Sequence, residues 1–123
     1  MVIDTSVFIE FLRKKDKTQT HLYKIAESKQ LYISSVTYYE LLMGASDSKK
    51  RNDIDNLTGD LIILPFDDLV ALKSSEIYHF LRKQNRMIEF RDIFIGATCL
   101  VYELPLKTLN IKDFSRISGL NLM

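Results

Sequence analysis

Short apolar runs alternate with longer segments whose apolar residues recur every three or four positions, and this pattern extends along the whole chain. The short runs predict strands, and they lie at 1–3, 31–33, 61–64, 106–108 and 120–122. The longer segments predict helices, because that spacing places apolar side chains on one helix face. Short apolar strands that alternate with helices are typical of a parallel sheet covered on both faces. We therefore predict an α/β fold: a three-layer α/β/α sandwich with a short, mostly parallel central sheet.

The predicted helices lie at about 5–12, 18–28, 34–43, 46–56, 68–81, 90–101 and 113–116. Gly44 is positioned to end the third helix, and Asp67 to cap the fifth. Leu12 is expected to face inward from the first helix, and the run at 61–64 to form a buried strand. The inward face of the fifth helix is expected to carry Leu69, Leu72, Ile77, Phe80 and Leu81.

The helix at 90–101 is the most apolar helix-length segment, and a single carboxylate, Asp92, stands near its start. A helix covered on most sides is a costly environment for an unpaired charge. Asp92 is therefore expected either to sit at the helix tip as a cap or to face a cleft in which it binds something.

The composition narrows the class of protein. The 123 residues are 46% hydrophobic and 27% charged, which indicates one globular domain spanning 1–123. The net charge of +1 gives no overall positive field, and basic runs such as 13–15 and 49–51 are most simply solvated faces. There is no signal-peptide pattern, no apolar run long enough for a bilayer and only one cysteine, Cys99, so a cytoplasmic location is expected.

In such a sheet the carboxyl ends of the strands share one edge, where ligands bind. The polar residues expected near that edge comprise three acids and three neutral side chains: Asp4, Glu40, Asp92, Ser6, Thr108 and Asn110. Each acid also has a local explanation. Asp4 fits a helix N-cap, Glu40 fits a capping box that begins at Thr37, and Asp92 fits a cap or a first-turn acid. The local sequence leaves both interpretations open for each acid.

The three acids together favour a metal site. Carboxylates that converge repel one another unless a cation joins them. Oxygen ligands without histidine or thiolate select Mg²⁺ or Mn²⁺ over zinc, and neither His21 nor His79 matches a metal-binding spacing. Such an ion polarises a phosphodiester and activates water for in-line attack.

Four blocks of sequence resemble the PIN-domain family in its VapC-like form, in the family's order and spacing. They are Val2-Ile3-Asp4-Thr5-Ser6-Val7-Phe8-Ile9, Ser34-x-Val36-x-x-x-Glu40-Leu41-x-x-Gly44, Asp92-Ile93-x-Ile95-Gly96-Ala97-Thr98 and Leu104-Pro105-Leu106-x-Thr108-x-Asn110-x-x-Asp113-Phe114. The resemblance implies a metal-dependent endoribonuclease, the toxin of a toxin–antitoxin module. It also implies inhibition by a VapB-type antitoxin and a homodimer.

The resemblance implies residue roles as well. By matching positions, Asp4, Glu40 and Asp92 would be the catalytic, metal-binding acids, Ser6 would orient Asp4, and Thr108 and Asn110 would line the same cleft. Asn110 stands where much of the family has an acid, which argues against a second tightly held metal. Two further departures, Leu109 where Arg is frequent and Glu103 where Gly is usual, leave the metal acids untouched.

Several alternatives stay open on sequence grounds. A phosphoacceptor receiver domain would need paired acids after the first strand and a late lysine, and the chain offers only Asp67-Asp68 and Lys112. A PIN fold that only binds, and a nuclease acting on DNA, are the other two. The resemblance also makes Glu10 and Glu89 secondary acid candidates, although both are more simply explained as solvated helix charges. Three aromatic residues could contact an antitoxin or belong to the core: Phe11, Tyr38 and Tyr39.

Overall fold

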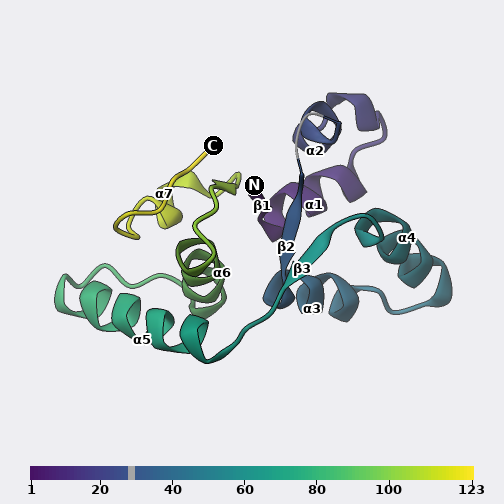
Figure 1. Cartoon of the computed structure of the whole chain (residues 1–123). Coiled ribbons are helices and arrows are strands. Elements are labelled where there is room, and N and C mark those ends of the chain that lie inside the picture. Colours follow the sequence, from purple (N-terminus) through teal and green to yellow (C-terminus); the bar gives the residue numbers. More distant parts are fainter. Residues whose placement is uncertain (28–29) are drawn as a thin grey trace.

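A four-stranded parallel sheet forms the centre of the molecule in a computed structural model that describes residues 1–27 and 30–123. The strands follow the order β3-β2-β1-β4, so β1 is central (Figure 1). Their bounds are β1 Val2–Ile3, β2 Tyr32–Ser34, β3 Ile62–Leu64 and β4 Leu106–Lys107. All three pairings are parallel, as the alternation of strands and helices predicts.

Helices cover both faces of the sheet and complete the predicted three-layer sandwich. Within the described residues these helices are α1 Thr5–Arg13, η1 Lys17–Gln19, α2 His21–Ile25, α3 Ser35–Gly44, α4 Ser48–Thr58, α5 Asp68–Lys83, α6 Phe90–Val101 and α7 Ile111–Phe114. Figure 1 shows α5, α6 and α7 on one side of the strands and α1 to α4 on the other.

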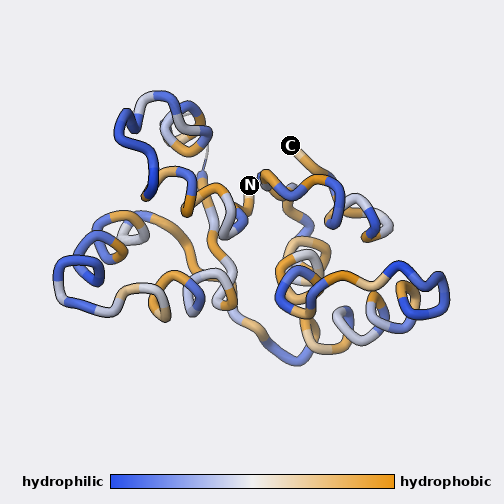
Figure 2. The backbone as a smooth tube through the Cα atoms, turned by 180° about the vertical axis from the view of Figure 1, so that it is seen from behind, coloured by the Kyte–Doolittle hydropathy of each residue, from blue (hydrophilic) through white to orange (hydrophobic). Residues whose placement is uncertain are grey.

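Each face of the sheet has its own apolar core, because neighbouring strand residues point to opposite faces. On β1, Val2 packs with α5 and α6, whereas Ile3 packs with α1, α3 and α4. On β2, Tyr32 and Ile33 divide in the same way. Figure 2 shows the apolar α6 near the centre of the molecule and the mostly hydrophilic α4 at its periphery.

Three expectations about burial are wrong. The run at 61–64 is not a buried strand, because β3 is the edge strand and leaves Ile62 and Ile63 exposed. Leu12 is exposed near the end of α1. On α5 only a narrow stripe faces α6 and the sheet, so Ile77 and Leu81 are buried while Leu69, Leu72 and Phe80 are exposed.

Some element boundaries also differ from the prediction. The segment expected as one helix at 18–28 is a 3-10 turn followed by α2, with Thr20 capping α2 through Tyr23 N at 3.3 Å. Its last position, Ser28, lies outside the described residues. Gly44 is the last residue of α3 rather than its cap, which is Ala45. The run at 120–122 forms one isolated bridge, Leu122 to Leu106.

The central position of β1 decides where a site can form. Successive crossovers run from β1 to β2 and then to β3 on one side, and the chain returns to pair β4 with β1 on the other. The strand order therefore reverses at β1. In a parallel sheet, ligands bind in the crevice outside the carboxyl ends of the strands at such a reversal. Asp4 follows β1, and Thr108 follows β4 directly.

No helix within the described part of the chain is long and apolar enough to cross a membrane.

The core on the α1 side can be tested with a matched pair of phenylalanines. Phe8 is fully buried, whereas Phe90 is 60% exposed. We expect Phe8→Ala to lower the free energy of unfolding by about 3–5 kcal/mol, because it removes a large side chain and leaves a cavity. Phe90→Ala is expected to change it much less. Urea denaturation measures both, and equal losses would contradict the assignment of the core.

Candidate active site

Asp4 is the most firmly held acid at the carboxyl edge of the sheet. It is buried between β1 and α1, and its Oδ2 accepts hydrogen bonds from Ser6 Oγ at 2.7 Å and Thr108 Oγ1 at 2.8 Å. The same oxygen accepts a longer bond from Ser6 N at 3.4 Å, so the predicted N-cap role is confirmed. Two hydroxyls and one amide therefore fix one carboxylate oxygen. The other, Oδ1, accepts no hydrogen bond from the residues that the structure describes.

The hydroxyls that hold Asp4 are themselves held by the loop after β4. Leu109 N donates to Ser6 Oγ at 3.0 Å, and Asn110 N donates to Thr108 Oγ1 at 2.9 Å. This network joins residues more than a hundred positions apart. It fixes the orientation of Asp4 before any ligand arrives.

Asp92 is the second acid of the site, and it is not a helix cap. Asp92 lies in the first turn of α6, and the N-cap position of this helix is Glu89. Asp92 is buried, with only 8% of its surface exposed. Its Oδ2 accepts one long hydrogen bond, from Asn110 Nδ2 at 3.4 Å. Burial, followed by the negative charge of Asp4, raises the pKa of Asp92 to about 6. The neighbouring Arg91 lowers this pKa, while the charges of Glu89 and Asp113 raise it further.

Asn110 links Asp92 to a further acid, Asp113. Its Nδ2 lies 3.4 Å from Asp92 Oδ2 and 3.1 Å from Asp113 Oδ2. Both neighbours are hydrogen-bond acceptors, so the amide must present its NH₂ group to them. The sequence-based prediction of the site does not include Asp113. Its spacing of three from Asn110, at the start of a short helix, is the signal that could have identified it.

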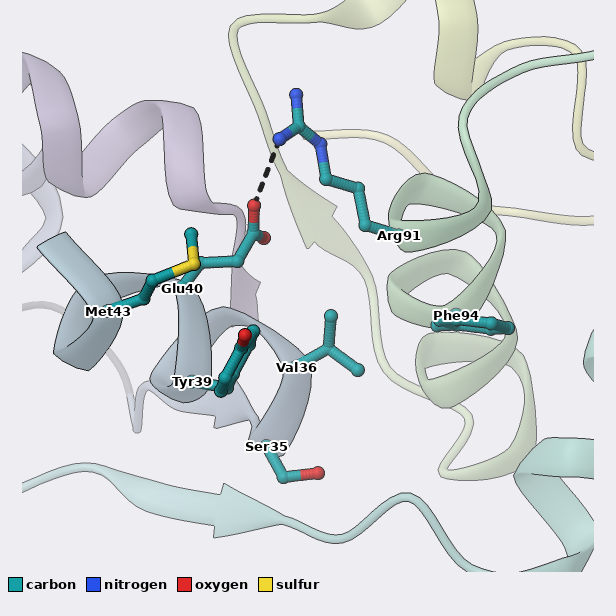
Figure 3. Close-up of a pocket in the computed structure, with 7 residues that line it drawn as sticks. All are labelled: Ser35, Val36, Tyr39, Glu40, Met43, Arg91 and Phe94. Atoms are coloured by element: carbon teal, nitrogen blue, oxygen red, sulfur yellow. Dashed lines mark hydrogen bonds and ion pairs between the residues drawn. The ribbon is translucent and has the colours of Figure 1, made fainter.

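Glu40 lies on α3 and has two partners. The capping-box explanation for it is wrong, because α3 is capped by Ser34, whose hydroxyl accepts from Thr37 N at 3.1 Å. Glu40 Oε1 instead accepts from Thr5 Oγ1 at 2.9 Å, next in sequence to Asp4. Its Oε2 accepts from Arg91 Nη1 at 3.2 Å (Figure 3).

Two cavities meet at the pair of Glu40 and Arg91. One, of about 470 Å³, lies between α3 and α6 and includes Tyr39, Met43 and Phe94 in its lining (Figure 3). The other, of about 620 Å³, runs between α1, α3 and α4. Its lining includes apolar and basic residues, among them Ile9, Leu12, Arg13, Ile54 and Lys50. Of the three candidate acids, Glu40 lines both cavities, whereas Asp4 and Asp92 are not among the described lining residues of either.

A chain of hydrogen bonds joins the predicted residues Asp4, Ser6, Thr108, Asn110 and Asp92, while a cleft lined by all of them stays a prediction. Glu40 is connected to this group through Thr5 but is paired with Arg91. No three His, Cys, Asp or Glu side chains within 1–27 and 30–123 are grouped closely enough to hold a metal ion. Burial, and then the charge of the buried Asp4, raises the pKa of the buried Asp92, and a pair of carboxylates in this state fits a hard divalent cation. The three-acid metal site stays a prediction.

The secondary candidates have other partners. Glu10 accepts hydrogen bonds from the backbone and ring of His21, whose Nδ1 lies 3.0 Å from Glu10 Oε2, and these bonds lower the pKa of Glu10. Glu89 pairs with Arg91 at 3.0 Å and is exposed. Cys99 is buried in the core, and this burial raises the pKa of its thiol to about 12. Tyr39 is exposed, while Phe11 and Tyr38 are partly buried against the core, so the three aromatic residues do not share one role.

Comparisons with known proteins agree with the motifs. A model of the PIN domain matches residues 1–120. The chain is 32% identical to Ribonuclease VapC of Rickettsia bellii, over 100% of this chain and 94% of that protein. It is 27% identical to Ribonuclease VapC1 of Methanocaldococcus jannaschii, over 99% and 84%. The structure of VapBC-1 from nontypeable Haemophilus influenzae is similar at a TM-score of 0.86 and 26% identity, over 99% and 95%.

The raised pKa of Asp92 predicts how stability depends on pH. Its folded-state pKa of about 6 exceeds the ordinary aspartate pKa of 3.8, so the folded protein binds more protons between these values. Unfolding free energy without divalent ions should therefore fall as pH rises from about 4 to about 6. We expect Asp92→Asn to remove this fall and to be about 1–3 kcal/mol more stable than wild type at pH 8. Denaturant titrations across this range, with the exposed Asp55→Asn as control, measure it; a variant less stable than wild type at pH 8 would contradict it.

Proposed function

The chain belongs to the PIN-domain family, and from this membership and its site we propose a metal-dependent endoribonuclease that hydrolyses RNA phosphodiester bonds. The observation that carries the proposal is the buried pair of Asp4 and Asp92. Burial, and then repulsion by Asp4, raises the pKa of Asp92, and a divalent cation would relieve that repulsion. The relatives called Ribonuclease VapC support the reaction type. Their names say nothing about the metal, which rests on the oxygen-rich donor set alone.

Each residue of the cleft has a separate task in this proposal. Asp4 and Asp92 would hold Mg²⁺ or Mn²⁺ through their free oxygens, and Glu40 would supply a third carboxylate. The chemistry that such an ion supplies when bound is polarisation of the phosphodiester and activation of a water molecule. Ser6 and Thr108 keep Asp4 oriented. The N-terminal ends of α1 and α6, next to these acids, favour a bound phosphate.

Asn110 supports a single ion rather than two. Its amide already bridges Asp92 and Asp113 by donating to both carboxylates. The neutral Asn110 amide stabilises the negative charges of Asp92 and Asp113 by hydrogen bonding, so a second cation is not needed to neutralise them. We therefore expect one tightly bound ion in each chain.

The proposed partners are an antitoxin of the VapB type, a second copy of the chain, and RNA as substrate, in the cytoplasm. Solved VapBC complexes from Haemophilus influenzae and Rickettsia felis, both at a TM-score of 0.86, support the antitoxin. The toxin of a toxin–antitoxin pair is the role that fits these relatives. The receiver-domain alternative loses its acid pair, because Asp67 caps α5 by accepting from Val70 N at 2.9 Å.

One observation favours a second candidate, a PIN fold that binds without turnover. Glu40 is paired with Arg91, and the acids do not form a group of three within the described residues. The two candidates differ in whether the purified chain cleaves RNA.

The enzymatic role predicts that Asp4→Asn and Asp92→Asn fold normally and lose Mg²⁺- or Mn²⁺-dependent RNA cleavage, because each removes a metal-binding carboxylate. We expect at least about a hundredfold loss with single-stranded RNA as substrate. Asp55→Asn, an exposed acid on α4, is the matched control. Unchanged cleavage by either variant would remove that residue from the mechanism, and an inactive wild type would favour the binding-only candidate.

The hydroxyl network predicts a smaller effect for Thr108→Val. This change keeps the side-chain volume but deletes the 2.8 Å hydrogen bond to Asp4. Outer-shell partners of metal ligands are typically worth about 10–100-fold in metal affinity or activity. We expect a loss in that range, measured as cleavage rate against Mn²⁺ concentration, while Thr18→Val on the exposed 3-10 turn changes nothing. Wild-type behaviour of Thr108→Val would show that Asp4 is oriented without it.

A further inference from the structure

Arg91 is the residue whose position the proposed mechanism does not yet explain. It directly precedes Asp92 on α6 and reaches across to α3, where its Nη1 lies 3.2 Å from Glu40 Oε2 (Figure 3). Its Nε lies 3.0 Å from Glu89 Oε2. The guanidinium is therefore shared between two carboxylates at the mouth of the site.

The burial of the partners is unequal. The Glu40 side chain is 12% exposed, whereas those of Arg91 and Glu89 are 55% and 66% exposed. The Arg91 side chain can therefore move into solvent with Glu89, and Glu40 is then left as a mostly buried carboxylate without its cation. The ion pair between Arg91 and Glu89, in which both side chains are exposed, contributes little to holding Arg91 in one position.

Each carboxylate oxygen of Glu40 already has a hydrogen-bond donor. Thr5 donates to Oε1 and Arg91 donates to Oε2, so a cation that binds Glu40 competes with these donors. The guanidinium provides at Glu40 the positive charge that a divalent ion would provide at Asp4 and Asp92. Guanidinium groups bind phosphate as well as carboxylate, in the same forked geometry.

We propose that Arg91 is a positioning residue that occupies Glu40 in the unloaded site and transfers to the RNA phosphate when RNA binds, which frees Glu40 to turn to the metal. This inference rests on the proposed function, and it assigns Arg91 opposite effects on the two ligands. Arg91 competes with the cation for Glu40 and repels it, so it weakens metal binding. It contacts the RNA backbone, so it strengthens RNA binding. A residue that merely tied α3 to α6 would do neither.

The first test measures Mn²⁺ alone, by electron paramagnetic resonance of the free ion, on the full chain. We expect Arg91→Gln to bind Mn²⁺ about three- to tenfold more tightly than wild type, because a competing charge is lost. Arg91→Lys keeps the charge but not the fork, so its affinity should lie between the two. The matched control is Arg51→Gln, which breaks an ion pair of similar length, 3.1 Å to Asp55, on α4 and should leave Mn²⁺ affinity unchanged.

The second test measures RNA binding without cleavage. Fluorescence anisotropy of a single-stranded RNA is compared between Asp92→Asn and the double variant Arg91→Gln/Asp92→Asn. We expect the double variant to bind about three- to tenfold more weakly, with a salt dependence reduced by about one phosphate contact. The control is the double variant Arg82→Gln/Asp92→Asn, because Arg82 lies on α5 and donates its hydrogen bond to Tyr78.

The outcomes separate this inference from the proposed function. If wild type binds Mn²⁺ and Asp4→Asn does not, but Arg91→Gln binds it no more tightly, the role of Arg91 is wrong and the metal site stands. If the RNA affinities of the two double variants are equal, the transfer to phosphate is wrong. If wild type binds no Mn²⁺, both proposals fail. Thermal denaturation shows whether Arg91→Gln is folded, and Arg91→Lys carries the test if it is not.

Discussion

The repulsion between the buried carboxylates of Asp4 and Asp92 is the constraint on which the rest of this structure depends. Burial alone disfavours a charged carboxylate, and a second negative charge nearby increases the cost. A protein that only needed to fold would gain stability by replacing Asp92, whose charge is buried beside that of Asp4. The fold instead retains both and surrounds Asp4 with two hydroxyls and an amide. Such an arrangement is understandable if a cation joins the pair during function.

The topology supplies the position for this pair. Asp4 follows the central strand β1, at the point where the strand order reverses. Asp92 comes to the same edge from α6, which packs on the face of the sheet opposite to α1. The loop after β4 then connects them, because Thr108 bonds to Asp4 and Asn110 bonds to Asp92. Since these contacts join the two ends of the chain, the site exists only in the fully folded domain. Arg91 and Glu40 add a movable pair beside this fixed centre.

Local patterns predicted what neighbouring residues determine, and missed what distant contacts determine. The strands, the parallel sheet and the caps at Asp4 and Asp67 follow from short-range periodicity and side-chain chemistry. The capping box at Thr37 failed because β2 ends at Ser34, which takes the cap itself. The exposure of β3 depends on its place at the sheet edge, which spacing along the chain does not encode. The ion pair between Arg91 and Glu40 spans 51 positions, so no local sequence pattern predicts it.

The most direct measurement is an anomalous diffraction map from crystals of the wild-type protein soaked with MnCl₂. The account predicts one strong peak in each chain, within coordination distance of the carboxylates of Asp4 and Asp92. A peak at other residues, or none at this pair in crystals whose cleft is open to solvent, would contradict the account.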